Sequence, residues 1–564
     1  MPYRAPIADF DFLLGHVVGF DRVARQDRFS EATPDTVHAL LTEAGRICQD
    51  VLAPLNRAGD LHPAVLENGV VRTSPGFAGG YKAIAEAGFV AISADPEYGG
   101  LGLPQTVTTC VNDMIGAACL SLELNPLMTQ GQIEALEHHA SDDLKALYLP
   151  RLISGEWCGT MNLTEPQAGS DVGALTSRAV PNGDGTYAVS GQKIYISWGD
   201  NDFTSNVVHL VLARLPDAPA GTKGISLFLV PKKLPDADGN PGVANALKVV
   251  SLEHKMGLHG SPTCVMQYDG ATGWLIGEEN RGMAAMFTMM NNARLGVGVQ
   301  GVSVADAATQ HAMAYAMDRK QGRSMIEGGT GTIMDHADVR RMLTEMKAET
   351  FAARAMALDL AVSIDLARAG DAAAASRAAI LTPIAKAYGT DTGIKVANMG
   401  IQVHGGMGFI EETGAAQYAR DVRVTAIYEG TNGIQAMDLV GRKMMDGGAA
   451  ILALVDEVET EAKAAGDAGQ SLAAAAAALR DTTQAVLALD LNDRFGGAAS
   501  YLAGFGRVLG AFYHLRAARA GDRVRQAMAG FYIARLLPEA QAAFVQARSG
   551  SAGLYDLSPE DLAA

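Results

Sequence analysis

Cysteine is scarce in this sequence. Its five cysteines include no Cys-x-x-Cys pair and no histidine at the spacing of a zinc partner, so neither a disulfide framework nor a metal site is indicated. Also missing is an uncharged apolar run of roughly 18 residues, the length that a membrane span needs. The N-terminus carries acids in its first dozen residues, and His16 interrupts its apolar stretch, so it lacks the form of a secretory or transit peptide. We therefore expect a cytoplasmic protein without a membrane segment.

Positive charge is also in short supply. The sequence has 45 Lys and Arg against 62 Asp and Glu, a net charge of −17, which argues against a general nucleic-acid binder. One stretch departs from this balance: residues 501–550 contain seven arginines and two acids. Helical spacing predicts that Arg516, Arg519 and Arg523 share one face. We expect these arginines to pair with acids elsewhere in the chain, and a local basic surface for DNA is the alternative.

No predicted strand is followed by Gly-x-Gly-x-x-Gly, so a Rossmann nucleotide site is not supported. A chain of 564 residues is too long for one core and predicts several domains. Apolar residues recur at helical spacing from Thr33 to about Leu152, and Thr33-Pro34 is typical of a helix start. Short alternating or β-branched runs then predict strands at 187–197, 207–215 and 224–233.

Long Ala- and Met-rich stretches indicate that helices return after about residue 283. The strands thus form one block between two helical regions rather than alternating with helices. Gly447-Gly448 is a plausible boundary, and the alanine- and arginine-rich section after it is also predicted to be helical. The expected domains are 1–155 (helical), 156–280 (β), 281–447 (helical) and 448–564 (helical extension).

The run 400–435 combines glycines with one carboxylate on a turn. Glycines 405, 406 and 408 fall within four residues, and glycine lets a backbone approach a ligand closely or take positive φ. Glu429 stands between an aromatic residue and a Gly-Thr-Asn-Gly turn. Partial desolvation on such a turn raises a glutamate pKa towards the range of a general base. The pattern indicates a base beside a cofactor, although a glutamate on such a turn, taken alone, is far more often a solvated loop residue.

Two further stretches accompany IYEGTNGIQ at 427–435: TEPQAGSDVGAL at 164–175 and DRKQGR at 318–323. In this combination the chain resembles the acyl-CoA dehydrogenase family, flavoproteins that oxidise the Cα–Cβ bond of an acyl-CoA thioester. The resemblance implies a mainly α fold with a middle β-barrel, in which a helical domain, the barrel and a four-helix bundle are followed here by a C-terminal helical extension. It also implies FAD held between barrel and bundle across a subunit interface, and hence a homo-oligomer, either dimer or tetramer.

The resemblance assigns roles to individual residues. Glu429 is expected to be the catalytic base. The residues expected to bind FAD are Met161, Leu163, Thr164, Tyr195, Ser197, Arg319, Gln402, Gly405, Gly406 and Thr431. Those expected to bind the acyl-CoA are Ser170, Arg294, Tyr428 and Gly430. Tyr195 stands where many relatives have tryptophan, and Trp198 either shields the flavin or packs elsewhere.

The resemblance also implies the reaction. Glu429 removes an α-proton from the thioester while the β-hydrogen leaves as hydride to the flavin, because flavins accept hydride and protein side chains do not. Two hydrogen-bond donors on the thioester carbonyl stabilise the enolate-like charge that forms. An electron-transfer flavoprotein is the expected electron acceptor. The alternatives are an acyl-CoA oxidase, which passes electrons to oxygen, and a DNA-binding relative of the family that uses a basic C-terminal domain.

The long form of the chain narrows the expected substrate. Together with its C-terminal extension it resembles bacterial members of the family that act on 3-methylmercaptopropionyl-CoA in dimethylsulfoniopropionate breakdown, and others that act on straight chains. We therefore expect a short to medium acyl-CoA, with 3-methylmercaptopropionyl-CoA as the specific candidate.

Overall fold

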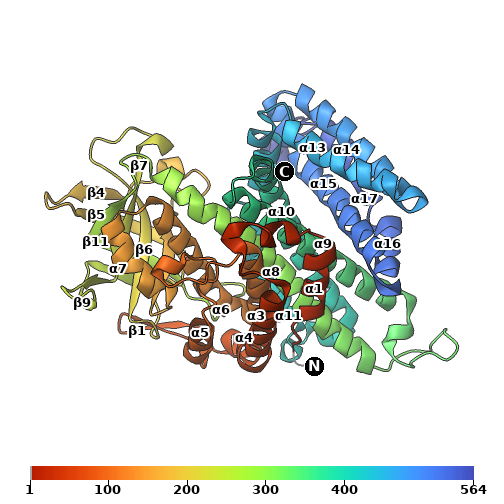
Figure 1. Cartoon of the computed structure of the whole chain (residues 1–564), viewed down its shortest axis with the longest axis horizontal. Coiled ribbons are helices and arrows are strands. Elements are labelled where there is room, and N and C mark those ends of the chain that lie inside the picture. Colours follow the sequence, from red (N-terminus) through yellow and green to blue (C-terminus); the bar gives the residue numbers. More distant parts are fainter. Residues whose placement is uncertain (1–2) are drawn as a thin grey trace. The chain divides into compact units, whose positions relative to one another are not determined.

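The computed structural model describes residues 3–564, and these residues form two compact units. One unit is Leu40–Gly296, and the other consists of Tyr3–Ala39 together with Val297–Ala564. Helices dominate the chain. The strands β3 to β11 fall in one stretch between them, as the sequence predicts, whereas β1 and β2 lie among the N-terminal helices. Figure 1 shows the larger strands grouped together in yellow and the C-terminal helices in blue.

Helices surround the central helix α6 in the unit Leu40–Gly296. The helix α6 (Gln105–His139) has the length and hydropathy of a membrane span, and it is the one such helix within residues 3–564. Its apolar window is entirely buried in the chain, as in the core helix of a globular domain. The other helices around it are the end of α3 (Pro34–Ile47), α4 (Ala53–Leu61), α5 (Phe77–Glu86) and α7 (Asp142–Ile153).

The strands of this unit form a seven-stranded sheet and two small hairpins. The sheet order is β10-β11-β5-β4-β6-β3, and β7 pairs with both β6 and β11. The pairings β11–β5, β5–β4, β4–β6, β6–β7 and β7–β11 therefore close a ring. The sheet strands are β3 (Trp157–Asn162), β4 (Arg178–Pro181), β5 (Tyr187–Ser197), β6 (Asn206–Arg214), β7 (Ile225–Pro231), β10 (Leu247–Leu252) and β11 (Thr263–Ile276). The hairpins are β1 (Val65–Glu67) with β2 (Val70–Arg72), and β8 (Lys233–Pro235) with β9 (Pro241–Ala244).

The N-terminal segment Tyr3–Ala39 belongs to the other unit. The helix α1 (Ile7–His16) buries Phe10 and Leu13 completely, and α2 (Asp21–Ala24) follows it. Arg525, far along the chain, donates a hydrogen bond to the Asp9 carboxylate. Long-range contacts of this kind, which local periodicity does not encode, place the segment.

Two glycines allow the long helices of this unit to pack closely. The helix α8 (Gly282–Asp318) crosses α10 (Ala372–His404), and a Cβ added at Gly301 would lie 2.2 Å from the Gly389 carbonyl oxygen. A side chain at either position would therefore push the helix backbones apart. The neighbouring elements are α9 (Ala337–Arg368), α11 (Ala415–Val422) and α12 (Asn432–Val440).

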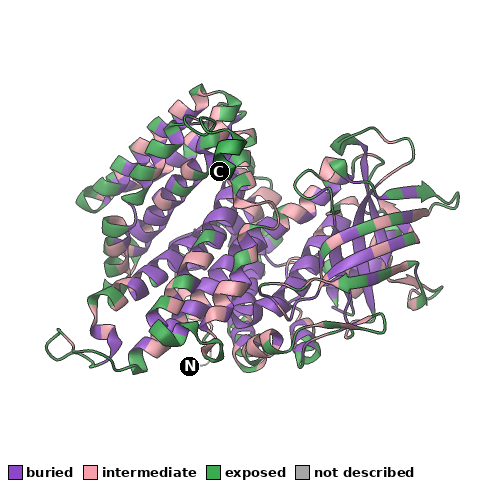
Figure 2. Ribbon diagram, turned by 180° about the vertical axis from the view of Figure 1, so that it is seen from behind, coloured by how far each residue is buried: buried purple, intermediate pink, exposed green. Residues whose placement is uncertain are grey.

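The chain after Gly447 is a packed helical extension. Figure 2 shows exposed positions along the outer faces of its helices and buried positions on the inner faces. Leu454, Val455 and Val458 of α13 are buried, so this helix packs an apolar face against its neighbours, and the predicted helical character of the section is confirmed. The helices are α13 (Ala449–Ala464), α14 (Gln470–Ala488), α15 (Leu491–Ala520), α16 (Arg523–Arg535), α17 (Glu539–Arg548) and α18 (Pro559–Ala563).

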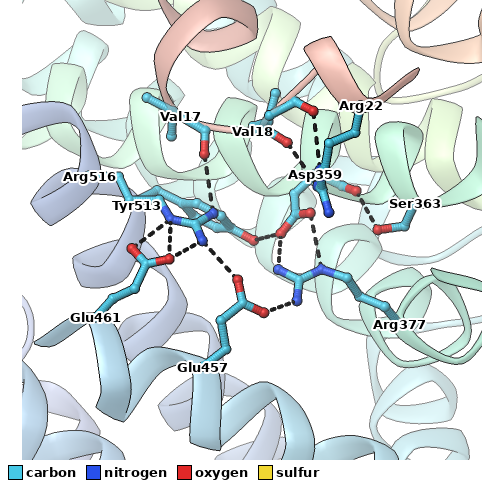
Figure 3. Close-up of polar contacts among 11 residues, drawn as sticks. Val17, Val18, Arg22, Asp359, Ser363, Arg377, Glu457, Glu461, Tyr513 and Arg516 are labelled. Carbon is cyan, nitrogen blue, oxygen red and sulfur yellow. Dashed lines mark hydrogen bonds and ion pairs between the residues drawn. The ribbon is translucent and has the colours of Figure 1, made fainter. Parts of the chain in front are cut away.

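The arginines of residues 501–550 include three that pair with acids of the same unit. Arg516 donates to Glu457 at 2.8 Å and also to Glu461, Arg507 lies 2.6 Å from Glu349, and Arg525 pairs with Asp9. Figure 3 shows Arg516 between the two glutamates of α13. These ion pairs agree with the expectation that the arginines pair with acids elsewhere in the chain.

The predicted shared face of Arg516, Arg519 and Arg523 is wrong. The helix α15 ends at Ala520, and Arg523 begins α16. Asp522 caps that second helix by accepting hydrogen bonds from the Val524 and Arg525 amides. Arg519 and Arg523 therefore lie on two different helices.

Candidate functional site

Hydrogen bonds bring two stretches singled out in the sequence together. The Ile194 amide of β5 donates to the Thr164 carbonyl at 2.9 Å, so the loop after β3 lies beside β5. Met161 and Leu163 are half-buried and pack against the core of this unit. Residues from about 161 to 164 and from 194 to 197 thus form one surface.

A buried ion pair supports this surface from behind. Lys193 of β5 lies 2.8 Å from Glu165, with exposed side-chain fractions of 0% and 2%, and it also donates to the Leu163 carbonyl at 3.0 Å. Burial alone would raise the pKa of Glu165, but Lys193 and hydrogen bonds from Ser177 and Thr176 lower it to about 2. Glu165 is therefore ionised, and the loop is fixed to the strand.

Tyr195 presents its ring outward from this support. It has a φ of +61°, which is unfavourable for a side chain of its size, and 62% of it is exposed. Among the described residues, the hydroxyls of Thr164 and Ser197 make no hydrogen bond. The exposed aromatic ring offers a stacking face, and the two hydroxyls offer hydrogen bonds. Together they fit a planar heterocycle with a polar edge, such as the flavin ring.

Trp198 packs inward, which decides between the two roles considered for it. It is fully buried despite a φ of +54°. Its indole nitrogen donates to the Ser121 carbonyl at 3.2 Å, and its ring stacks on Phe77 with centroids 6.3 Å apart. Trp198 is thus part of the core of its unit, while Tyr195 is the aromatic residue left for a ligand.

The two acyl-CoA candidates of this unit differ in exposure. Ser170 is exposed in the loop after Thr164, next to the exposed Gly169. Arg294 lies within α8 and is 7% exposed, so only a small part of its side chain is accessible.

The candidates for the adenosine diphosphate of FAD lie at two helix ends in the other unit. Gln402 and Gly406 are exposed near the end of α10, where Gly405 ends the helix with φ +59° and ψ −138°, a conformation suited to glycine. A Cβ at Gly405 or Gly406 would touch nothing within 4 Å. Arg319 is exposed just after α8, and its guanidinium makes no ion pair within residues 3–564.

Glu429 stands on a sharp turn. It has a φ of +55° and is followed by Gly430 at +80°, and both are half-buried. The Tyr428 hydroxyl donates to the Gln300 side chain. Thr431 caps α12, accepting a hydrogen bond from the Ile434 amide at 3.2 Å, which leaves its hydroxyl hydrogen available to a ligand.

Sequence reasoning missed the residues that hold this turn. Gln435 donates from Nε2 to the Glu429 carbonyl at 3.0 Å, and Lys386 donates from Nζ to the Gly430 carbonyl at 2.9 Å. Lys386 lies in an apolar helical pattern in which one lysine carries no distinguishing signal. Gln435 stands in the quoted run, and its spacing of six residues from Glu429 offered the only indication.

Four family models match the chain in order. They describe the N-terminal domain of acyl-CoA dehydrogenase at residues 34–156, its middle domain at 160–271, its C-terminal domain at 280–445 and an acetyl-CoA dehydrogenase C-terminal-like domain at 451–558. The chain is also 45% identical over 520 residues to 3-methylmercaptopropionyl-CoA dehydrogenase of Ruegeria pomeroyi, covering 89% of this chain and 88% of that one. The chain belongs to the acyl-CoA dehydrogenase family.

Other relatives agree with this membership. The broad-specificity linear acyl-CoA dehydrogenase FadE5 of Mycobacterium tuberculosis is 34% identical over 482 residues, 81% of this chain and 78% of that one. The structure of Caenorhabditis elegans ACDH-11 in complex with C11-CoA has the same fold, with a TM-score of 0.78 over 94% of this chain and 91% of that one, at 22% identity. Neither relative is named as an oxidase or as a DNA-binding protein.

Family membership makes this protein an acyl-CoA dehydrogenase, an oxidoreductase that uses FAD. Its substrate is an acyl-CoA thioester. In Leu40–Gly296 the candidate flavin surface is the exposed ring of Tyr195 with the hydroxyls of Thr164 and Ser197. In the other unit the candidate catalytic group is Glu429 on its turn.

Proposed function

We propose that Glu429 is the catalytic base and that the preferred substrate is a short to medium acyl-CoA, with 3-methylmercaptopropionyl-CoA as the specific candidate. The observation that carries the substrate proposal is the 45% identity to a 3-methylmercaptopropionyl-CoA dehydrogenase over most of both chains. A thioether at the far end of a three-carbon acyl chain leaves the hydrogens on Cα and Cβ intact. The same chemistry therefore serves this thioester and a straight chain of similar length.

The strained turn supports the assignment of Glu429. A glutamate at positive φ costs about 1–2 kcal/mol, and such strain persists where surrounding contacts hold it and often marks functional sites. Here donors from two helices hold the turn. Glu429 takes the α-proton of the thioester, and Tyr428 and Gly430 flank the acyl group. FAD supplies the hydride acceptor that no side chain offers.

We propose that the surface around Tyr195 binds the flavin ring, with Met161, Leu163, Thr164 and Ser197 beside it. The inward packing of Trp198 supports this proposal, because it leaves Tyr195 as the exposed aromatic residue. Thr431 offers its hydroxyl to the flavin. Ser170 and Arg294 are proposed contacts of the CoA moiety.

The adenosine diphosphate part of FAD is assigned to Gln402, Gly405 and Gly406, together with Arg319 of a neighbouring subunit. The exposure of Arg319 without an ion pair in the described chain supports such a contact, because a guanidinium fork suits two phosphate oxygens. The protein is then a homo-oligomer.

The division into four domains at 155, 280 and 447 also remains a proposal. The positions of the four family models support it. The closed ring of strand pairings supports a barrel as the middle domain. We further propose an electron-transfer flavoprotein as the electron acceptor and the cytoplasm as the location.

Anaerobic mixing of the purified protein with acyl-CoAs tests the substrate. Propionyl, butyryl, hexanoyl, palmitoyl and 3-methylmercaptopropionyl thioesters are compared by the rate at which each bleaches the flavin absorbance. We expect the fastest bleaching with the short chains and the thioether. Each buried methylene contributes about 0.8 kcal/mol to binding, which favours a chain that fills the pocket. A pocket that fits a short chain rejects a much longer one by steric clash. A maximum at palmitoyl-CoA would exclude the substrate proposal and leave the family assignment intact.

A further inference from the structure

Lys386 is a buried cation beside the turn that carries Glu429. It lies on α10 with no exposed surface, and a buried ammonium group requires hydrogen-bond partners. Its Nζ donates to the Gly430 carbonyl at 2.9 Å and to the Asn432 side-chain oxygen at 3.0 Å. One partner is therefore the residue directly after Glu429, and the other is the first residue of α12.

The turn needs such restraint. Glu429 and Gly430 both have positive φ, and a glutamate keeps this conformation only where its surroundings favour it. Lys386 holds the Gly430 carbonyl, and Gln435 holds the Glu429 carbonyl. The carbonyl groups of two consecutive peptide units, Glu429–Gly430 and Gly430–Thr431, are thus fixed by side chains from α12 and α10.

Asn432 connects this lysine to a carboxylate of the same helix. Its amide nitrogen donates to Asp391 at 2.8 Å and to the Thr390 hydroxyl at 3.0 Å. Asp391 therefore offsets the buried charge of Lys386 through the amide between them. The close packing of α10 on α8 at Gly389 makes the helix a rigid support for the arrangement.

We infer that Lys386 is a positioning residue for the dehydrogenation: it fixes the Gly430 carbonyl and Asn432, and so keeps the Glu429 carboxylate aimed at the α-hydrogen of the thioester. The inference rests on the proposed role of Glu429 as base. A general base has to lie within hydrogen-bond reach of its proton, and a displacement of about 1 Å slows a reaction by about 100-fold.

The test compares Lys386→Met and Lys386→Gln with a control on the same helix. Methionine fills the space without donating a hydrogen bond, whereas glutamine keeps a neutral donor. The control is Lys395→Met, because Lys395 also lies on α10 but pairs with Glu345 and Glu349. Each variant is assayed for flavin content, thermal unfolding, and the rate of flavin reduction by butyryl-CoA over a range of concentrations.

We expect Lys386→Met to reduce flavin about 100-fold more slowly at saturating butyryl-CoA. Its flavin content and its half-saturating concentration stay those of the wild type, and Lys386→Gln recovers part of the rate. Lys395→Met reduces flavin at the wild-type rate even where its unfolding temperature falls. This split between rate and stability is not expected of a lysine that only supports the fold.

Two results would overturn the positioning role. One is a wild-type rate in Lys386→Met, and the other is a rate that falls only in proportion to lost flavin and lost folded protein. The variant Glu429→Gln separates this inference from the proposed function. If Glu429→Gln is slow and Lys386→Met is fast, only the role of Lys386 is wrong, whereas a fast Glu429→Gln removes the base assignment itself.

Discussion

The guanidinium of Arg507 lies 2.6 Å from the carboxylate of Glu349, and this contact joins the C-terminal extension to the long helix α9. Glu349 is 1% exposed and also accepts hydrogen bonds from Lys395 and the Tyr388 hydroxyl at 2.8 Å. Burial would raise the pKa of Glu349, but Arg507 and Lys395 keep it lower than usual. The extension thus contributes a cation to a buried acid of the helices that it covers.

Replacing Arg507 by methionine is expected to destabilise the protein by about 3 kcal/mol, because it leaves a buried carboxylate with one cation fewer. Chemical denaturation followed by circular dichroism measures the change. The matched control is Arg548→Met, at an exposed position at the end of α17, which we expect to have no measurable effect. Equal stability of the two variants would show that the buried pair contributes little.

Replacing Glu429 by glutamine is expected to retain the flavin and to slow its reduction by acyl-CoA at least about 100-fold, the lower range for loss of a general base. The amide keeps the shape of the carboxylate but does not accept the proton. Stopped-flow bleaching under anaerobic conditions measures the rate. Glu412→Gln, at an exposed glutamate of the same region, is the control and should bleach normally. Substantial bleaching in Glu429→Gln would move the base elsewhere.

Replacing Arg319 by alanine is expected to weaken both flavin retention and assembly, because the exposed guanidinium is proposed to hold the pyrophosphate of a neighbouring subunit's FAD. The flavin-to-protein absorbance ratio after gel filtration and the mass from light scattering measure the two effects. Lys320→Ala, at the next exposed cation, controls for lost charge. A wild-type protein that is a fully flavinated monomer would contradict the interface proposal.

The pair of Glu165 and Lys193 predicts a dependence of stability on pH. The pKa of Glu165 is about 2 in the folded chain, below its unfolded value of about 4.3. The ionised Glu165 therefore stabilises the folded protein fully above about pH 5, and this stabilisation is lost as the pH falls towards 2. Urea denaturation measures the free energy of unfolding at pH 6 and at pH 3. Its decrease between the two pH values should be smaller for the double variant Glu165→Gln, Lys193→Met than for the wild type.

An exposed pair in the same unit is the control for this measurement. Lys248 and Asp269 lie 3.8 Å apart with more than half of each side chain exposed, and surface pairs contribute little. The double variant Lys248→Met, Asp269→Asn should therefore lose as much stability at low pH as the wild type. An identical pH dependence in both double variants would show that other carboxylates cause the loss.

Local patterns predicted three strands of the sheet closely. The expected strand 187–197 coincides with β5, and those at 207–215 and 224–233 agree with β6 and β7 to within two residues. Alternating or continuous apolar residues between turn signals are a local property, because each strand shows its burial in its own sequence. The signal for the helix start at Thr33 is also local, since the Thr33 hydroxyl accepts a hydrogen bond from the Thr36 amide at 3.2 Å.

The parts that could not be predicted depend on distant residues. Nothing near Trp198 in the sequence indicates that its indole faces Ser121 on α6. The partners of Lys386 likewise lie more than 40 residues away, so no motif contains both ends of the contact. The contacts of Tyr3–Ala39 are also distant in sequence, since Asp9 pairs with Arg525 near the other end of the chain.

The division into two units determines which part of the protein each spectroscopic signal of unfolding follows. Its three tryptophans, Trp157, Trp198 and Trp274, all lie within Leu40–Gly296, and the first two are fully buried. Intrinsic fluorescence excited at the indole band therefore follows this unit alone, whereas far-ultraviolet circular dichroism is dominated by helices of both. A melt in which the two signals coincide would mean that the units unfold together, and a gap between them would show which unit unfolds first.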